Sequence, residues 1–251
     1  MAPTGFWKAL GLAALLAITS AAPAAAQEVT LTRLDCGNGA NDPRRFSDTF
    51  AYSETTKPFT FSCYVIRHGS DVMVWDTGYL PGSVPSATNK PLAELLKQMN
   101  VNVDDVKYVG ISHFHADHSG QLGALKNATL LIGKGDWDGL NFMPAMGGAN
   151  VAGFADWIAE KRKVEPLMAD KDVFGDGTVT VLRSPGHTPG HSMLLVRLKD
   201  TGPVILTGDA VHFRENYEHE RVPGFNFDRA QTLASIQRIK QIEKNLKATV
   251  I

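Results

Sequence analysis

The segment ISHFHADHSG concentrates side chains that can bind metal ions. His113, His115, Asp117 and His118 supply four imidazole or carboxylate groups within six positions. Because alternate residues of an extended segment share a face, His113 and His115 can reach one cation together. Asp117 and His118, at the following bend, can turn toward a second cation. A lone histidine would be weak support, but this density of ligand types predicts a metal site.

Two later segments carry further metal ligands. SPGHTPGHS places His187 in a turn rich in proline and glycine, and LTGDA places Asp209 at the end of an apolar segment. Either residue alone would be commonplace. Strand ends that meet on one rim, however, would bring both residues to the cluster at His113. We interpret His191, in the same turn as His187, as a turn histidine that supports the site from outside.

Imidazole and carboxylate ligands indicate the chemistry of such a site. Two divalent cations would lower the pKa of a shared water enough to give hydroxide near neutral pH, so no serine or cysteine nucleophile is needed. If this hydroxide attacks a substrate and an oxygen leaves, Asp117 would lie next to both the hydroxide and the leaving oxygen. Asp117 is therefore the predicted proton shuttle. The ligand types favour zinc, and cobalt, iron or manganese would also fit.

Predicted strands position these groups. Apolar or alternating segments typical of strands are residues 28–34, 59–67, 71–78, 106–112, 128–133, 178–184, 192–198 and 203–209. A helix is predicted near residues 91–99 and a closing helix begins near Asp228, where Gln231 can complete a capping pair. The apolar stripe of the closing helix comprises Leu233, Ile236, Ile239, Ile242 and Leu246. Strands in two runs with few helices between them predict two packed sheets with helices outside.

Residues 134–163 differ from the rest of the chain, because they combine glycine with large apolar groups and show no sustained strand pattern. We interpret them as a helical insert with a loop. The candidates for the wall of an apolar substrate pocket are Trp137, Phe142, Met143, Phe154 and Trp157. The alternative for each single side chain is ordinary core packing.

Residues 1–26 are typical of a cleaved signal peptide, with Lys8 before an apolar run and Ala24 and Ala26 before Gln27. The apolar run is shorter than the roughly 20 residues of a spanning helix, so we expect no stable membrane anchor after cleavage. The prediction is a periplasmic or secreted protein with one domain over residues 27–251. In an oxidising compartment, pairing of Cys36 with Cys63 is permitted but not required.

The overall composition narrows the class of partner. With 251 residues, 43% of them hydrophobic and 20% charged, the chain can bury a sizeable core. Its formal net charge of -1 provides no basic field to attract phosphates, so a nucleic-acid partner has no electrostatic support. A small-molecule substrate is the better expectation.

HFHADH, SPGHTPGHS, LTGDA and the earlier VWDTG together resemble the signature series of the metallo-β-lactamase superfamily. The resemblance implies an α/β (α+β) fold, an αββα sandwich of two mixed sheets flanked by helices. It also implies a site with two divalent metal ions. The first ion would be held by His113, His115 and His187, the second by Asp117 and His118, with Asp209 bridging them. Asp76 of VWDTG would orient ligands without touching the ions.

Within this superfamily, the run LTGDAVHFRENYEHERVPGFNFD and the helix after it resemble N-acyl homoserine lactone lactonases. These enzymes open the lactone ring of bacterial quorum-sensing signals, so the resemblance implies a metallohydrolase that quenches quorum sensing by attack of a metal-bridging hydroxide. Many of them carry a tyrosine three residues after the bridging aspartate, where this chain has His212. An imidazole N–H can donate to the same substrate oxygen, and a surface histidine is the alternative. Dimers are common among these enzymes, so a homodimer is a further expectation.

The family places its last ligand, a histidine, just after the strand that follows the closing helix. This sequence stops inside the corresponding segment, at KATVI. We expect a truncated C-terminus, and the alternative is a protein that binds one metal firmly and the other weakly.

Three other functions compete with the lactonase. A true β-lactamase would have cysteine or serine in place of Asp209. An exported organophosphate hydrolase would share the metal site and the signal peptide, and only its pocket would separate it from a lactonase. A metal-binding relic, inactive through loss of the last histidine, is the non-enzymatic alternative.

Overall fold

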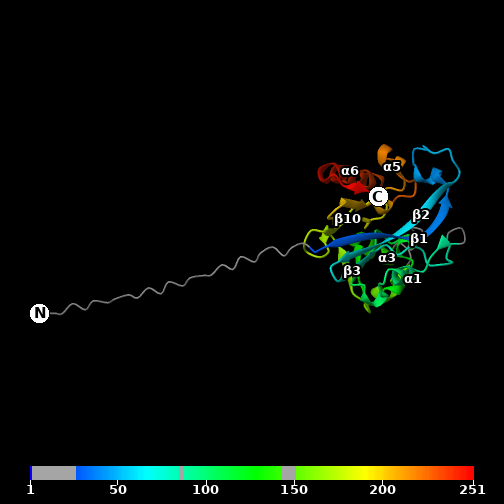
Figure 1. Cartoon of the computed structure of the whole chain (residues 1–251). Helices are drawn as coiled ribbons and strands as arrows, with labels where there is room; N and C mark the ends of the chain where they lie inside the picture. Colours follow the sequence, from blue (N-terminus) through cyan, green and yellow to red (C-terminus); the bar gives the residue numbers. More distant parts are fainter. Residues whose placement is uncertain (2–26, 85–87, 143–150) are drawn as a thin grey trace.

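Two mixed β-sheets form the centre of the molecule in the computed structural model (Figure 1). The first sheet has seven strands, in the order β4 (Thr88–Asn89), β1 (Val29–Asn41), β2 (Lys57–His68), β3 (Asp71–Trp75), β5 (Tyr108–Gly110), β6 (Thr129–Gly133) and β7 (Val164–Leu167). The second has five, in the order β12 (Thr249–Val250), β11 (Gly202–Leu206), β10 (Ser192–Leu198), β9 (Val179–Arg183) and β8 (Lys171–Asp172). In each sheet, parallel and antiparallel pairs occur together.

The structure describes residue 1 and residues 27–84, 88–142 and 151–251. The predicted signal peptide and the pocket candidate Met143 therefore lie outside the described residues. Among the residues that are described, no helix combines the length and the hydropathy needed to cross a membrane.

Helices cover the outer faces of both sheets. The α-helices are α1 (Leu92–Gln98), α2 (Ala116–Ser119), α3 (Lys134–Phe142), α4 (Ala155–Ile158), α5 (Arg214–His219) and α6 (Arg229–Leu246). Short 3-10 helices are η1 (Pro43–Phe46), η2 (Val103–Asp105), η3 (Leu122–Ala124), η5 (Val151–Phe154) and η6 (Gly208–Ala210). Figure 1 shows α6 beside β10 on one side of the molecule and α1 and α3 on the opposite side, with the sheets between them.

Three apolar clusters fill the spaces between the four layers, because successive side chains of a strand point to opposite faces. Val72 and Val74 of β3 pack with α1 and α4 outside the first sheet, whereas Met73 and Trp75 pack between the two sheets. Alternate side chains of β10 likewise pack either in the cluster between the two sheets or in the cluster under α6. The predicted αββα sandwich is therefore confirmed, with every layer joined to the next by an apolar cluster.

The start of α6 is confirmed at Asp228, which is its N-cap residue. The Asp228 carboxylate accepts hydrogen bonds from the backbone N–H and the side-chain amide of Gln231, each at 2.9 Å. These bonds satisfy one of the N–H groups that a helix leaves unpaired at its first turn. Of the apolar stripe, Ile236 and Ile239 are fully buried and the other three side chains lie partly buried.

A disulfide joins Cys36 of β1 to Cys63 of β2, across the long antiparallel pair. Both residues are fully buried in the cluster between the first sheet and its helices. The question that the sequence left open is thus answered by the structure. The bond closes a loop with a sequence separation of 27 residues.

Replacement of both cysteines by alanine is expected to lower the free energy of unfolding by about 3 kcal/mol, because a loop of this length restricts the unfolded chain. Chemical denaturation with and without a strong reductant measures the effect. The reductant should destabilise the native protein and leave the double variant unchanged. Equal stability of the two proteins under oxidising conditions would contradict the prediction.

Candidate metal centre

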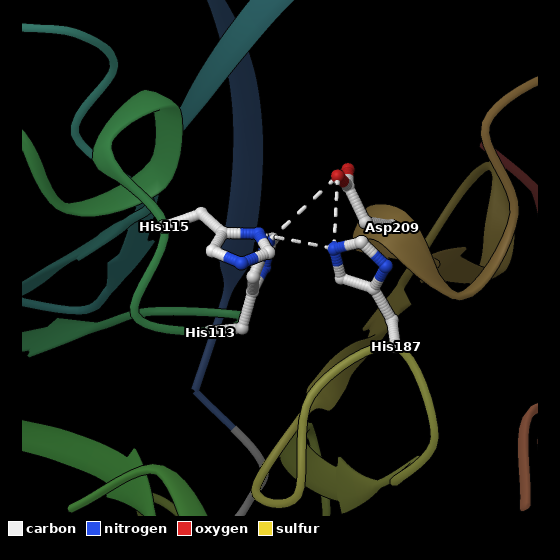
Figure 2. A group of neighbouring side chains, drawn as sticks. All are labelled: His113, His115, His187 and Asp209. Carbon is white, nitrogen blue, oxygen red and sulfur yellow. Dashed lines mark hydrogen bonds and ion pairs between the residues drawn. The ribbon is translucent and has the colours of Figure 1, made fainter. Parts of the chain in front are cut away.

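The predicted ligands come from loops at the ends of strands in both sheets. His113 and His115 follow β5, His187 lies in the turn between β9 and β10, and Asp209 follows β11 in η6. Figure 2 shows the three imidazoles and the carboxylate of this first group pointing toward one another from these separate segments. One ligand atom of each residue lies within 4.8 Å of those of the others.

The spacing within the first group fits a tetrahedral ion. With metal–nitrogen distances near 2.0–2.1 Å, the ligand atoms of such an ion lie roughly 3.3 Å apart. Here Nδ1 of His115 lies 2.8 Å from Nε2 of His113 and 3.1 Å from Nε2 of His187. Oδ2 of Asp209 lies 3.5 Å from His187 Nε2 and 3.8 Å from His113 Nε2. The donor set and its dimensions therefore suit a divalent cation such as zinc.

A second group adjoins the first and shares Asp209 with it. It comprises Asp117, His118 and Asp209. Nε2 of His118 lies 3.2 Å from Oδ1 of Asp209 and 3.4 Å from Oδ2 of Asp117. Asp209 thus directs one carboxylate oxygen toward each group. This is the arrangement that the resemblance implied for a bridging ligand.

Burial sets the charge of the imidazoles in the first group. Desolvation lowers the pKa of His113 well below its ordinary value and that of His187 to about 3, so both are neutral near pH 7. Neutral imidazole is the form that coordinates a cation. For His118, burial also lowers the pKa, but the carboxylates of Asp117, Asp209 and Asp76 outweigh it and raise the pKa well above the ordinary value. A positive charge in the second group is therefore stabilised by its neighbours.

Asp76 orients the second group, as the resemblance implied. It follows β3 with a left-handed backbone, φ 57°. Its carboxylate accepts hydrogen bonds from Nδ1 of His118 at 2.9 Å and from the backbone N–H and hydroxyl of Ser112 at 2.7 and 3.0 Å. A proton held on Nδ1 leaves Nε2 of His118 free to face Asp117 and Asp209.

Two residues that were not predicted to belong to the site also orient imidazoles. Asn226 accepts a hydrogen bond from Nδ1 of His187 at 3.0 Å and donates to Thr232 at 2.6 Å. Ser112 contacts Nδ1 of His113 at 3.1 Å. Asn226 lies 39 residues beyond His187, so no local pattern could connect them. His191 lies behind the group, where its Nδ1 contacts Ser184 at 2.8 Å, in keeping with a supporting role.

His212 faces the ligands rather than open solvent. Its Nε2 lies 3.1 Å from Oδ2 of Asp209, its side chain is 3% exposed, and its ring packs against Phe46. The alternative of a surface histidine is therefore wrong. His212, the predicted donor to a substrate oxygen, thus has Asp209 as a carboxylate neighbour.

A cavity of about 660 Å³ opens beside the two groups. Asp117, His118 and Asp209 lie in its wall together with Ile251, whose backbone oxygen accepts hydrogen bonds from the backbone N–H and hydroxyl of Thr207 at 2.8 and 2.9 Å. The rest of the wall is strongly aromatic and includes Phe46, Phe59, Phe61, Tyr64, Trp75, Tyr79 and Phe225.

The insert at residues 134–163 does not supply this aromatic wall among the described residues. Phe154 and Trp157 are 0% and 1% exposed and belong to the cluster between the first sheet and its helices, and Trp137 packs against the same cluster. Assigning these three side chains to the pocket was wrong, because apolar groups of short helices close a core here. The side chain of Phe142, like Met143, lies outside the described residues. The pocket aromatics come instead from β2, the end of β3 and the loop after it, the segment after β1, and the segment before α6.

A two-sheet sandwich with adjoining histidine and aspartate groups at one rim is the architecture expected of a metal-dependent hydrolase. The family model of the Metallo-beta-lactamase superfamily matches residues 57–246, and the chain belongs to this superfamily.

Among proteins with similar sequences, the N-acyl homoserine lactonase AttM of Azorhizobium caulinodans is 34% identical over 162 residues. The match covers 62% of this chain and 60% of that relative, so the chain spans less than two thirds of the relative's length. A solved quorum-quenching N-acyl homoserine lactone lactonase superposes with a TM-score of 0.74 at 24% identity, covering 90% of this chain and 92% of the other. AidC, a dizinc quorum-quenching lactonase, gives a TM-score of 0.71 at 17% identity, covering 91% and 88%. These structures establish the fold.

Replacing Asp76 with asparagine is expected to weaken cation binding in the second group by roughly 10- to 100-fold. Asparagine tolerates the left-handed backbone, but its amide is a poorer partner for Nδ1 of His118 than a carboxylate. Competition with a chromophoric chelator measures the affinity. Asp71→Asn is the matched control, since Asp71 begins the strand that Asp76 follows and pairs with Lys107 at the surface. Equal affinities of the Asp76 and Asp71 variants would contradict the role given to Asp76.

Proposed function

We propose that the chain is a metal-dependent lactonase that opens the ring of N-acyl homoserine lactones. The observation that carries the proposal is the sharing of Asp209 between two histidine and aspartate groups at the wall of an aromatic cavity. The lactonase names of the relatives support the choice of a cyclic ester as substrate. The chemistry suits a reaction that needs no serine or cysteine nucleophile.

The proposed cofactor is a pair of divalent cations, most simply zinc. His113, His115 and His187 would hold one, Asp117 and His118 the other, and Asp209 would contact both. Cations in these positions supply a Lewis acid for the substrate carbonyl and lower the pKa of a water molecule. Imidazole and carboxylate donors favour zinc, and the AidC structure is described as dizinc. Cobalt, iron and manganese remain compatible with the same donors.

Asp117 is the proposed proton carrier. Burial would raise its pKa, but the adjacent His118 outweighs this and lowers it, so the carboxylate is ionised near neutral pH. It lines the cavity, where a substrate can reach it. When the carbon–oxygen bond of the ring breaks, a proton must pass to the departing alkoxide oxygen. Asp117 can take a proton from the attacking water and deliver it there.

Tyr79 is the proposed hydrogen-bond donor to the substrate. Its ring packs edge-on against Phe61, with 5.0 Å between the ring centroids, and it lines the cavity. Burial raises the pKa of its phenol to about 12, so the hydroxyl keeps its proton and can donate. The donor role of His212 stays a prediction beside this one, because His212 also lines the cavity and its Nε2 lies 3.1 Å from Oδ2 of Asp209.

The aromatic wall is the proposed binding surface for the acyl chain. Phe46 contacts Phe59 and Phe225 with ring centroids 5.0 and 5.2 Å apart. Such aromatic rings remove apolar substrate surface from water. A substrate with an aliphatic chain next to a polar ring fits a cavity that is aromatic on one side and ionic on the other.

We also propose an exported protein. The segment before residue 27 has the pattern of a signal peptide, and the buried disulfide between Cys36 and Cys63 suits an oxidising compartment such as the periplasm.

A homodimer stays a prediction, and size-exclusion chromatography with light scattering would examine it.

The lactonase proposal is examined by proton release on acyl homoserine lactones, with a paraoxon-type phosphotriester and a cephalosporin as competing substrates. We expect lactone turnover that a chelator abolishes and added zinc or cobalt restores. Brisk turnover of either competing substrate without lactone opening would assign the chain to another branch of the superfamily. Firm metal binding without any turnover would instead support the relic.

Replacement of Tyr79 by phenylalanine is expected to reduce kcat for lactone opening by ten-fold or more while it changes cation affinity little, because only the donor hydroxyl is removed. Steady-state kinetics and chelator competition provide the two readouts. Phe61→Leu is a suitable control, because it alters the same wall and leaves the hydroxyl in place. Unchanged kcat in Tyr79→Phe would remove Tyr79 from the mechanism.

A further inference from the structure

Asp136 is a buried carboxylate that belongs to none of the ligand motifs. It lies in the first turn of α3 and is 0% exposed. It is not among the residues that line the cavity or form the two ligand groups. Burial of a carboxylate costs free energy unless the carboxylate is fully hydrogen-bonded. The hydrogen-bond partners of Asp136 therefore indicate its role.

Three hydrogen bonds reach Asp136 from two different ligand loops. Its Oδ2 accepts from the backbone N–H of Phe114 at 3.1 Å and from the hydroxyl of Thr188 at 2.8 Å. Its Oδ1 accepts from the backbone N–H of Gly190 at 2.6 Å. Phe114 lies between His113 and His115, and Thr188 directly follows His187. One carboxylate therefore connects the loops that carry all three imidazoles of the first group.

The backbone around Asp136 approaches the His187 turn very closely. A Cβ added to Gly133 would lie 1.8 Å from the carbonyl oxygen of Gly190, and one added to Gly135 would lie 2.6 Å from the carbonyl of Pro189. A Cβ on Gly190 would lie 2.2 Å from the backbone nitrogen of Asp136. Glycine at these positions lets the end of β6 and the start of α3 lie directly on the turn.

The donors around Asp136 select a carboxylate. All three neighbours donate, and an ionised carboxylate is the side chain that only accepts. Burial raises the pKa of Asp136 to about 7, while the bonds from Gly190, Thr188 and Phe114 act in the opposite direction. An asparagine would set its NH₂ group against at least one N–H or O–H donor, and that partner would lose its acceptor.

We propose that Asp136 is a positioning residue that fixes the loop of His113 and His115 against the turn of His187, and so sets the affinity of the first group for its cation. The connection acts through the backbone next to each ligand rather than on the imidazole rings. Small displacements of a ligand loop separate nitrogen atoms that must meet at one ion, so the loss of the connection weakens binding. The inference rests on the metal site of the proposed function.

The experiment compares cation affinity in the native protein, Asp136→Asn, Thr188→Val and Asp138→Asn, after removal of metal and titration against a chromophoric chelator. Asp138 is the matched control, because it lies in the same helix and pairs with Lys134 at the surface. We expect Asp136→Asn to lower the affinity for one cation by ten-fold or more, Thr188→Val to lower it less, and Asp138→Asn to match the native protein. The absorption spectrum of bound cobalt should change in Asp136→Asn, since the ligand geometry changes.

A folded Asp136→Asn protein with native affinity and a native cobalt spectrum would overturn the inference. If Asp136→Asn fails to fold, Thr188→Val decides, and native affinity in that variant overturns it. A native protein that binds no cation would remove the proposed metal site and this inference together. If the native protein binds the cation firmly and the Asp136→Asn and Thr188→Val variants have the same affinity, only this inference fails.

Discussion

The convergence of imidazoles and carboxylates on one buried point is the constraint on which the site depends. His113 and His187 are almost fully buried, and their ring nitrogens lie close to the Asp209 carboxylate. Groups of this kind lose hydration when they leave water, and mutual repulsion between protonated imidazoles would add to that cost. Neutral imidazoles around an anionic carboxylate relieve both effects, and a cation between them would complete the balance of charge.

The fold meets this constraint by holding each ligand from behind. Alternation along the strands joins four layers through three apolar clusters, so the strand ends that carry the ligands have fixed positions. Polar side chains then orient individual groups, Asp76 for His118 and Asn226 for His187. The bonds from the Phe114 and Thr188 segments to Asp136 connect two of the loops. Rigid strands, oriented rings and connected loops together hold the ligand side chains close to one another.

Local patterns predicted much of this architecture. The strands were predictable because they are short apolar or alternating segments, and α6 was predictable because Asp228 caps its own helix. The ligand motif was predictable because His113, His115 and His118 are neighbours in sequence. Asn226 and Asp136 were not predictable, since their partners lie far along the chain. The aromatic wall was assigned to Trp157 and its neighbours because an apolar side chain in a short helix suits a core and a pocket equally. The partner of His212 likewise depended on tertiary geometry.

If these distant residues form one cage for cations, elemental analysis of the purified protein detects the bound metal. We expect a stoichiometric divalent transition metal in the native protein and its loss in Asp209→Ala and His115→Ala proteins that remain folded by circular dichroism. The absence of such a metal from a native protein equilibrated with zinc, or its full retention in both variants, would show that the residues form no such cage.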